Sequence, residues 1–252
     1  SRLANQDEFD ALADTMASYN HGVFLITTGN DKGMEFMERF AERSGRPSLY
    51  AAHFYYAHEP ERGRRLMQGA QAARERGNLV YTQGACQPLS LAFTLDAAYI
   101  LKAIEPWPAT LDHEELRGQL TDPSFREAFR KTLATPTPGR VFNGRWDWVI
   151  ITRPTDANAD LAERTVADVA AERGVDPLDF FLDLGLAENF ETFYTLQLLN
   201  VDEDGVQELI TNDGTLVSLS DAGAHNTLLC DAAYGMHFLS HWVRERKVFD
   251  LP

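Results

Sequence analysis

The sequence is poor in cysteine and in basic residues. Only Cys86 and Cys230 occur among 252 residues, far apart in the chain. Two such cysteines form neither a disulfide framework nor a CxxC zinc site, so we expect a reducing, cytoplasmic compartment. Lysine and arginine number 23 against 38 acidic residues, which gives a formal net charge of −15. A nucleic acid or an anionic membrane surface would need a basic patch, and the composition argues against both as partners.

Long apolar runs and the common nucleotide and nucleophile motifs are also missing. No run is long enough to span a bilayer, and no stretch has the pattern of a secretory signal, so we expect no membrane partner. The sequence contains no G-x-S-x-G elbow, no Walker loop and no H-x-H pair. "GNDKG" does not match the G-x-G-x-x-G fingerprint. These absences count against serine hydrolases and nucleotide-binding enzymes.

Short apolar strands alternate with amphipathic helices over the first 85 residues. At 44% hydrophobic, the chain can bury a sizeable core. Such alternation predicts βαβ units with a parallel sheet, at a spacing close to that of a (β/α)8 barrel. We expect helices and strands in turn over 5–20, 22–29, 32–45, 47–54, 61–77 and 78–85.

Residues 86–147 interrupt this rhythm with short helical segments and the proline-rich stretches "EPWPA" and "TPTPGR". We interpret them as a helical insertion between barrel strands, within a single domain spanning 1–252. Beyond the insertion we expect strands over 146–152, 190–200 and 215–221. Helices are expected over 161–174, 176–189, 202–213 and 226–247.

The stretch "TLVSLSDAGAHN" (215–226) carries the first candidate site residues. An apolar strand ends at Asp221, and His225 follows four residues later. Ligands gather at the carboxyl ends of parallel strands, so a carboxylate there is placed for chemistry. Asp221 could instead cap the next helix, although Asn226 stands closer to that helix. From the residues alone, His225 is equally a site residue or a polar loop residue.

Other histidines and Cys86 give further candidates. His53 ends the strand over 47–54, and it could share an ion with Asp221, since imidazole and carboxylate both suit zinc. A lone histidine is nevertheless more often structural. His237 and His241 have zincin spacing, but "HFLSH" lacks the required glutamate, so we expect a packed helix there. Cys86 has no histidine base near it in sequence and is predicted to be an inert thiol.

The order of segments from residue 146 onward resembles the second half of D-aminoacylase-type enzymes of the amidohydrolase superfamily. The similarity lies in the helix pair of "LAERTVADVAAERGVDPLDFFLDLGLAEN", in the strand "FYTLQLLN" and above all in "LSDAGAH". This resemblance implies a partial TIM (β/α)8 barrel with about strands 4–8. The activity it implies is metal-dependent hydrolysis of an amide C–N bond, as in an N-acyl amino acid.

The resemblance also implies roles for single residues. Asp221 would bind the metal and transfer the proton of the attacking water, and His53 falls where the family carries a histidine ligand. His225 would lie beside the substrate. The implied cofactor is zinc, one or two ions in the complete enzyme, absent or only partly held here because the H-x-H pair is missing. We therefore expect a fragment that forms a homo-oligomer or pairs with a complementing chain segment.

Two other functions stay open. A non-catalytic α/β module that binds a small ligand or a partner would explain the absent metal ligands without a truncation. A hydrolase using only the carboxylates of Asp221 and Glu191 ranks last, because Glu191 stands at the start of its strand rather than at its carboxyl end.

Overall fold

The structure, a computed structural model, describes residues 4–27, 33–108, 112–135, 137, 140, 142–220 and 232–251. It divides into two compact units, which are described separately. The first unit holds Ser1–Leu89, Leu199–Ala224 and Cys230–Pro252, and the second holds Ser90–Leu198 and His225–Leu229. The sequence predicts an insertion at 86–147 within one domain. The second unit is larger than that insertion, because it also includes the segments that follow it up to residue 198.

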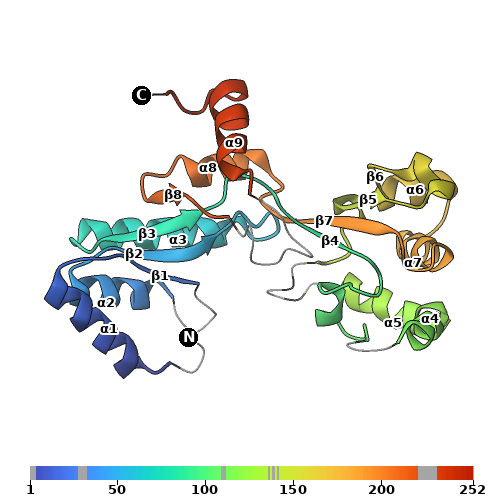
Figure 1. Cartoon of the computed structure of the whole chain (residues 1–252), viewed down its shortest axis with the longest axis horizontal. Helices are drawn as coiled ribbons and strands as arrows, with labels where there is room; N and C mark the ends of the chain where they lie inside the picture. Colours follow the sequence, from blue (N-terminus) through green and yellow to red (C-terminus); the bar gives the residue numbers. More distant parts are fainter. Residues whose placement is uncertain are drawn as a thin grey trace. The chain divides into compact units, whose positions relative to one another are not determined.

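The first unit is built on a parallel sheet of four strands, in the order β1-β2-β3-β8 (Figure 1). Each neighbouring pair is parallel, which confirms the α/β interpretation. The strands are β1 (Phe24–Thr27), β2 (Ser48–His53), β3 (Val80–Gly84) and β8 (Thr215–Val217). The helices are α1 (Gln6–Tyr19), α2 (Met34–Ser44), α3 (Pro60–Glu75), α8 (Glu203–Ile210) and α9 (Tyr234–His237), with a π-helix, η4, over Phe238–Glu245.

Local capping signals explain where the helices begin and end. Asn5 caps α1 through a capping box with Glu8, so two backbone N–H groups gain side-chain acceptors. Gly45 ends α2 in the left-handed conformation with φ 63°, which glycine adopts without steric cost. Asn20 ends α1 in the same conformation with φ 49°. These helix ends lie within two residues of the predicted ones.

The helices α1, α2 and α3 pack on one face of the parallel sheet. The Ser48 hydroxyl on β2 donates a 2.8 Å hydrogen bond to the Met37 carbonyl of α2, which fixes the helix-facing side of that strand. Burial of apolar side chains between these layers is the main stabilising contribution to the unit. The cluster consists of Phe9, Ile26, Met37, Ala41, Ala70, Ala73 and Val80.

The second unit has its own sheet, in the order β4-β7-β5-β6. Its strands are β4 (Leu89–Phe93), β5 (Val149–Arg153), β6 (Arg164–Thr165) and β7 (Phe193–Leu199). The helices are α4 (His113–Thr121), α5 (Pro123–Ala134), α6 (Val166–Arg173) and α7 (Pro177–Ala187), with 3-10 turns η1 (Leu101–Ala103), η2 (Trp146–Trp148) and η3 (Asp156–Leu161).

The partial-barrel prediction was wrong for two of its strands. The segments 146–152 and 190–200 were expected to continue the parallel sheet, but β5 and β7 pair antiparallel in the second sheet. The physical reason is that a short apolar run specifies a buried strand without specifying its direction or its neighbour. The parallel part therefore consists of four strands, and the described residues form no closed barrel.

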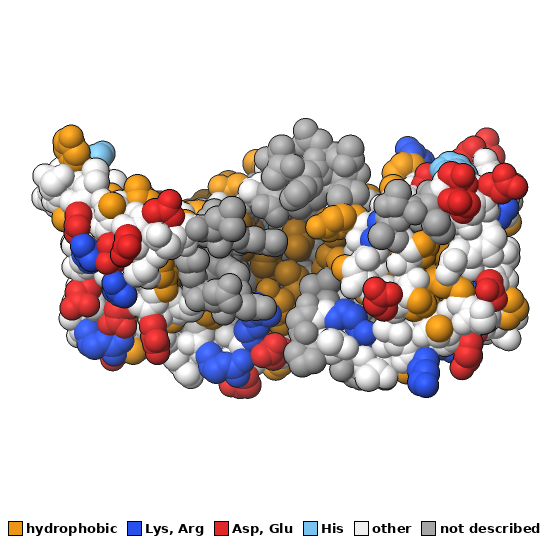
Figure 2. Space-filling model, turned by 90° about the horizontal axis from the view of Figure 1, so that it is seen from below, with side chains coloured by type: hydrophobic (Ala, Val, Ile, Leu, Met, Phe, Trp, Pro, Cys, Tyr) orange, Lys and Arg blue, Asp and Glu red, His pale blue; other side chains and the backbone are white. Residues whose placement is uncertain are grey.

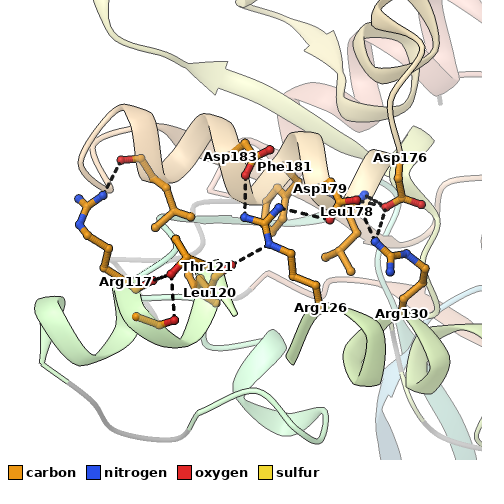
Figure 3. A network of polar contacts seen from close by, with 12 residues as sticks. Arg117, Leu120, Thr121, Arg126, Arg130, Asp176, Leu178, Asp179, Phe181 and Asp183 are labelled. Carbon is orange, nitrogen blue, oxygen red and sulfur yellow. Dashed lines mark hydrogen bonds and ion pairs between the residues drawn. The ribbon is translucent and has the colours of Figure 1, made fainter. Parts of the chain in front are cut away.

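Arginines of α4 and α5 contact side-chain carboxylates and a backbone carbonyl of α7 (Figure 3). Arg126 contacts Asp183 at 2.6 Å and Asp179 at 3.3 Å. Arg130 contacts Asp179 at 3.0 Å, and Arg117 donates to the backbone carbonyl of Leu186 at 3.0 Å. The Arg126 side chain is only 15% exposed, so its ion pairs are screened less by solvent than ordinary surface pairs.

A buried carboxylate, Glu188, organises the chain beyond α7. It accepts hydrogen bonds from the Thr155 backbone N–H, the Thr155 hydroxyl, the Asn158 amide and the Thr192 hydroxyl, at 2.6–3.0 Å. Burial alone would raise the pKa of Glu188, but these hydrogen bonds outweigh it and hold the pKa below its usual value. Glu188 therefore remains charged, and it joins the segment before η3 to the end of α7.

The surface carries many paired charges, with red and blue side chains next to one another in Figure 2. Examples are Arg43 with Asp14 at 2.6 Å and Arg76 with Glu38 at 2.6 Å. Exposed pairs of this kind contribute roughly 0–1 kcal/mol each, so they influence solubility more than stability. Within the described ranges, no helix has the length and apolar character needed to cross a membrane.

Candidate functional site

His53 stands at the carboxyl end of β2, as the sequence predicts, but its ring faces the helix layer. It is fully buried, and neither ring nitrogen has a hydrogen-bond partner. A Cβ added at Gly63 of α3 would lie 3.3 Å from the His53 Nε2 atom. If side chains alternated regularly along β2, His53 would point to the sheet face opposite Ser48. A register shift between Tyr50 and His53 turns the His53 side chain toward α3 instead.

Burial determines the protonation state of His53. Removal from water lowers the pKa of the imidazole to about 4, and the nearby Gly63 backbone opposes this only in part. The ring is therefore neutral at physiological pH. A neutral, unpartnered imidazole retains a free lone pair, which is the form in which histidine binds a metal.

The buried ring of His53 predicts a pH-dependent stability. Its pKa is about 4 in the folded chain and roughly 6.5 when unfolded, so the unfolded chain binds more protons between these values. Stability from this group is present above pH 6.5 and is lost as the pH falls toward 4, by about 3 kcal/mol in total. Urea unfolding at pH 7 and at pH 4.5 measures this loss.

Two variants test whether His53 causes this pH dependence of stability. His53→Leu removes the titrating group, and we expect the difference in unfolding free energy between pH 7 and 4.5 to shrink by about 2–3 kcal/mol. His58→Gln, at an exposed histidine in the following loop, should leave the difference as in the wild type. An equal pH dependence in wild type and His53→Leu would contradict the buried neutral imidazole.

Asn200 joins the carboxyl ends of β2 and β3 through four hydrogen bonds. Its side-chain oxygen accepts from the Tyr55 backbone N–H at 2.6 Å, and its own backbone N–H donates to the Tyr55 carbonyl at 3.0 Å. The side-chain amide donates to the carbonyls of Ala85 and Gln87 at 3.0 and 3.1 Å. Asn200 is buried and left-handed, with φ 58°. Asn200 therefore holds the segment that follows His53 next to the segment that follows β3.

The segment after β8 runs toward the same strand ends. The backbone N–H groups of Ser218 and Leu219 both donate to the Gly84 carbonyl at 3.2 Å, and Gly84 is the register partner of His53. The next candidates along the chain, Asp221 and His225, lie outside the described residues. Their predicted roles as proton-transferring carboxylate, metal ligand and substrate contact stay predictions.

The described residues do not fit a metal centre by themselves. Within the ranges that the structure describes, no group of three histidine, cysteine, aspartate or glutamate side chains is placed to hold an ion. His53 is a single donor, and tight zinc sites need three or four. Glu191 is exposed and lies two residues before β7, at the amino end of the strand. The carboxylate pair of Asp221 and Glu191 thus gains no support.

Cys86 and the histidine pair near the carboxyl terminus are structural. Burial raises the pKa of the Cys86 thiol to about 11, and its sulfur donates to the Tyr234 carbonyl, as expected for an inert thiol. The His237 and His241 rings stack at 5.0 Å, and His241 contacts Glu203 at 3.0 Å. Trp242 beside them is buried, which confirms the predicted packed helix.

A small cavity lies within the second unit. Its volume is about 170 Å³. Trp146 and Leu178 supply apolar walls, while Arg130 and Asn143 supply polar groups. The Arg130 guanidinium is already paired with Asp176 and Asp179, so the cavity carries no free positive charge from this residue.

No protein-family model matches the chain, and no curated protein matches it. Among solved structures, however, several are similar over nearly its whole length. The chain is similar to D-aminoacylase structures. These are the enzymes that the sequence resembles.

Each of these structures is similar over 99% of this chain, which spans 43% of theirs. A D-aminoacylase with a binuclear metal centre has 15% sequence identity and a TM-score of 0.48. An N-acyl-D-glutamate deacylase from Bordetella bronchiseptica, complexed with zinc and a phosphonate inhibitor, has 16% identity and a TM-score of 0.48. Another D-aminoacylase, described as defining a novel subset of amidohydrolases, has 15% identity and a TM-score of 0.49.

Proposed function

We propose that the chain belongs to a metal-dependent hydrolase of amide C–N bonds, of the N-acyl amino acid type. The observation that carries the proposal is the strand-end arrangement of the first unit. The residues after β8 bind the carboxyl end of β3 at Gly84 and continue directly into "SDAGAH". In a parallel sheet this is the edge where catalytic groups gather.

In this proposal Asp221 takes a proton from the attacking water and later gives it to the leaving amine. His225 contacts the substrate. A metal, supplied with ligands beyond those described, would polarise the amide carbonyl. Asn200 holds the strand ends in place, and His53 remains a candidate ligand whose ring would have to turn away from α3.

Hydrolysis of a panel of N-acyl-D- and N-acyl-L-amino acids, with and without added zinc, tests the function. The assay uses this chain and also any longer protein encoded by the same reading frame, because the chain spans 43% of the similar enzymes. We expect zinc-dependent release of the amino acid in at least one form. No hydrolysis by any form, with every substrate of the panel, would overturn the proposal.

A substitution of Asp221 separates catalysis from helix capping. In whichever form is active, we expect Asp221→Asn to lower kcat/KM by about 10²–10⁴-fold, the range of general acid–base catalysis. The melting temperature should change little. Asp213→Asn, at an exposed aspartate before β8, is the matched control and should keep full activity. A large loss of stability with Asp221→Asn would instead support a helix cap.

The cavity in the second unit supports an alternative, a non-catalytic module that binds a small ligand. A volume of about 170 Å³ accommodates only a small molecule, and Trp146 provides a flat apolar wall. Binding would change the tryptophan fluorescence of the wild type but not that of Trp146→Phe. Zinc-dependent hydrolysis, together with no ligand that binds in this cavity, would count against this alternative.

A further inference from the structure

The π-helix η4 near the carboxyl terminus places ionisable side chains along one side of the helix. Its backbone hydrogen bonds join residues five apart, as from the Arg246 N–H to the His241 carbonyl at 2.7 Å. This pattern widens each turn, and π-helical turns in proteins are frequent at functional sites. His237, His241 and Glu245 are spaced four residues apart, and each contacts the next.

His241 lies between two carboxylates. Its Nε2 atom is 3.0 Å from the Glu203 Oε1 atom at the start of α8, and its Nδ1 atom is 3.3 Å from the Glu245 Oε2 atom. An ionised carboxylate only accepts hydrogen bonds, and a neutral imidazole donates from one nitrogen only. Both contacts are therefore satisfied only when His241 is protonated, and the imidazolium then joins η4 to α8.

His237 is under the opposite constraint. Its ring stacks on that of His241, with centroids 5.0 Å apart and an interplanar angle of 24°. Two positively charged rings at this distance repel each other. Burial, and after it the proximity of His241, lowers the pKa of His237. The carboxylates of Glu203 and Glu245 and the Cys86 backbone act in the opposite direction but are weaker together.

The two histidines are the groups in this region whose usual pKa lies nearest to neutral pH. Hydrogen bonds from Arg244 and His241 hold the pKa of Glu245 below its usual value, so this carboxylate keeps its charge in weak acid. Burial raises the pKa of the Cys86 thiol to about 11, so the thiol stays neutral. Other ionisable side chains on the described elements packed here are Tyr55, Glu203, Asp204, Glu208, Tyr234, Arg244, Arg246 and Lys247.

Trp242 connects the histidine pair to the docking of the helix. It directly follows His241, it is buried, and its indole N–H donates to the Cys86 carbonyl at 2.6 Å. Its ring packs in one cluster with Val206 and Leu209 of α8. A change in charge on the two imidazole rings therefore acts on the contacts that hold η4 against α8.

We propose that the stacked pair of His237 and His241 is a pH-sensitive switch for the docking of the carboxyl-terminal helix. One proton, on His241, holds η4 to the carboxylate of α8. A second proton, on His237, places two like charges in the stack and releases α9 and η4. A histidine that is favoured neutral in the folded chain contributes stability that is present above roughly pH 6.5 and is lost on acidification. The proposal does not depend on the hydrolase function.

Hydrogen exchange followed by mass spectrometry tests the switch. Protection of the amides in 236–246, relative to the intrinsic exchange rate, is compared at pH 7.5 and pH 5.5. We expect acidification to lower protection at least about fivefold more in the wild type than in His237→Gln, which takes up no proton. His53 is present in both chains, so its own pH effect cancels. His58→Gln, at an exposed histidine outside the stack, is the matched control and should behave as the wild type.

An equal loss of protection in the wild type and His237→Gln overturns the proposal. The indole N–H signal of Trp242 in nuclear magnetic resonance gives a second measurement on the wild type. The chain has four tryptophans, and the signal missing from Trp242→Phe identifies it. We expect this signal to shift or broaden reversibly from pH 7.5 to pH 5.5, while the other three stay in place. A Trp242 signal unchanged at pH 5.5, or the joint loss of all four signals, also overturns the proposal.

Discussion

Replacing Asn200 by alanine is expected to lower the unfolding free energy of the first unit by about 3–4 kcal/mol. The substitution removes three side-chain hydrogen bonds and leaves the Tyr55 N–H and the carbonyls of Ala85 and Gln87 without their partner. Unsatisfied buried groups cost roughly 1–3 kcal/mol each, and the left-handed backbone costs alanine about 1 kcal/mol more. Water can reach some of these backbone groups in the variant, so the expected loss of unfolding free energy is smaller than the sum of these costs. Urea denaturation followed by circular dichroism measures the change.

Asn20→Ala is the control for the backbone effect. Asn20 is also left-handed, at φ 49°, but it is exposed, and its side chain accepts a hydrogen bond from Arg46 at 3.1 Å. We expect this variant to lose about 1 kcal/mol, the cost of the left-handed conformation alone. If Asn200→Ala lost no more than Asn20→Ala, the hydrogen bonds at the strand ends would contribute nothing to stability.

Trp242→Ala is expected to cost about 3–5 kcal/mol and to detach the carboxyl-terminal helix, because large aromatic side chains in a core cost this much on truncation. Trp242 is only 1% exposed, and its indole N–H donates to the Cys86 carbonyl at 2.6 Å. It packs in one cluster with Cys86 and with apolar residues of α8, namely Val206, Leu209 and Ile210. Hydrogen exchange over α9 and η4 should rise together with the loss of stability.

Two companion variants separate packing from hydrogen bonding. Trp242→Phe keeps most of the buried ring area and removes the indole donor, so we expect a smaller loss of about 1–2 kcal/mol. Leu239→Ala lies in the same π-helix, but Leu239 is 47% exposed, and a change within about 0.5 kcal/mol is expected. Equal losses for Trp242→Ala and Leu239→Ala would contradict the docking of η4 through Trp242.

The local elements were predictable from the sequence because their signals are local. Asn5 and Asp176 cap helices at the expected places, and Gly45 and Gly174 end helices in the left-handed conformation. Strand direction was not predictable: β5 and β7 look like buried parallel strands in the sequence but pair antiparallel. Direction depends on which segments meet in space, and an apolar run does not specify that.

The candidate site was predictable only in part. The position of His53 at a strand end follows from the strand pattern, whereas its orientation depends on a register shift that the alternation does not show. Asn200 was missed altogether. The signal available was an asparagine directly after an apolar strand, a residue type that tolerates the left-handed conformation. Its hydrogen-bond partners lie up to 145 residues away, beyond any local pattern.

The second unit has a consequence for how such a chain could be assembled. Ser90–Leu198 is continuous in sequence, and it is entered through β4 and left through β7, which are neighbours in one sheet. The point of entry and the point of exit are therefore adjacent strands. A module with this geometry can be acquired or excised as one piece, since the host chain has only a short gap to close. Its buried Glu188 and the arginines of α4 and α5 that pair with α7 lie within this segment, so its internal contacts would survive the transfer.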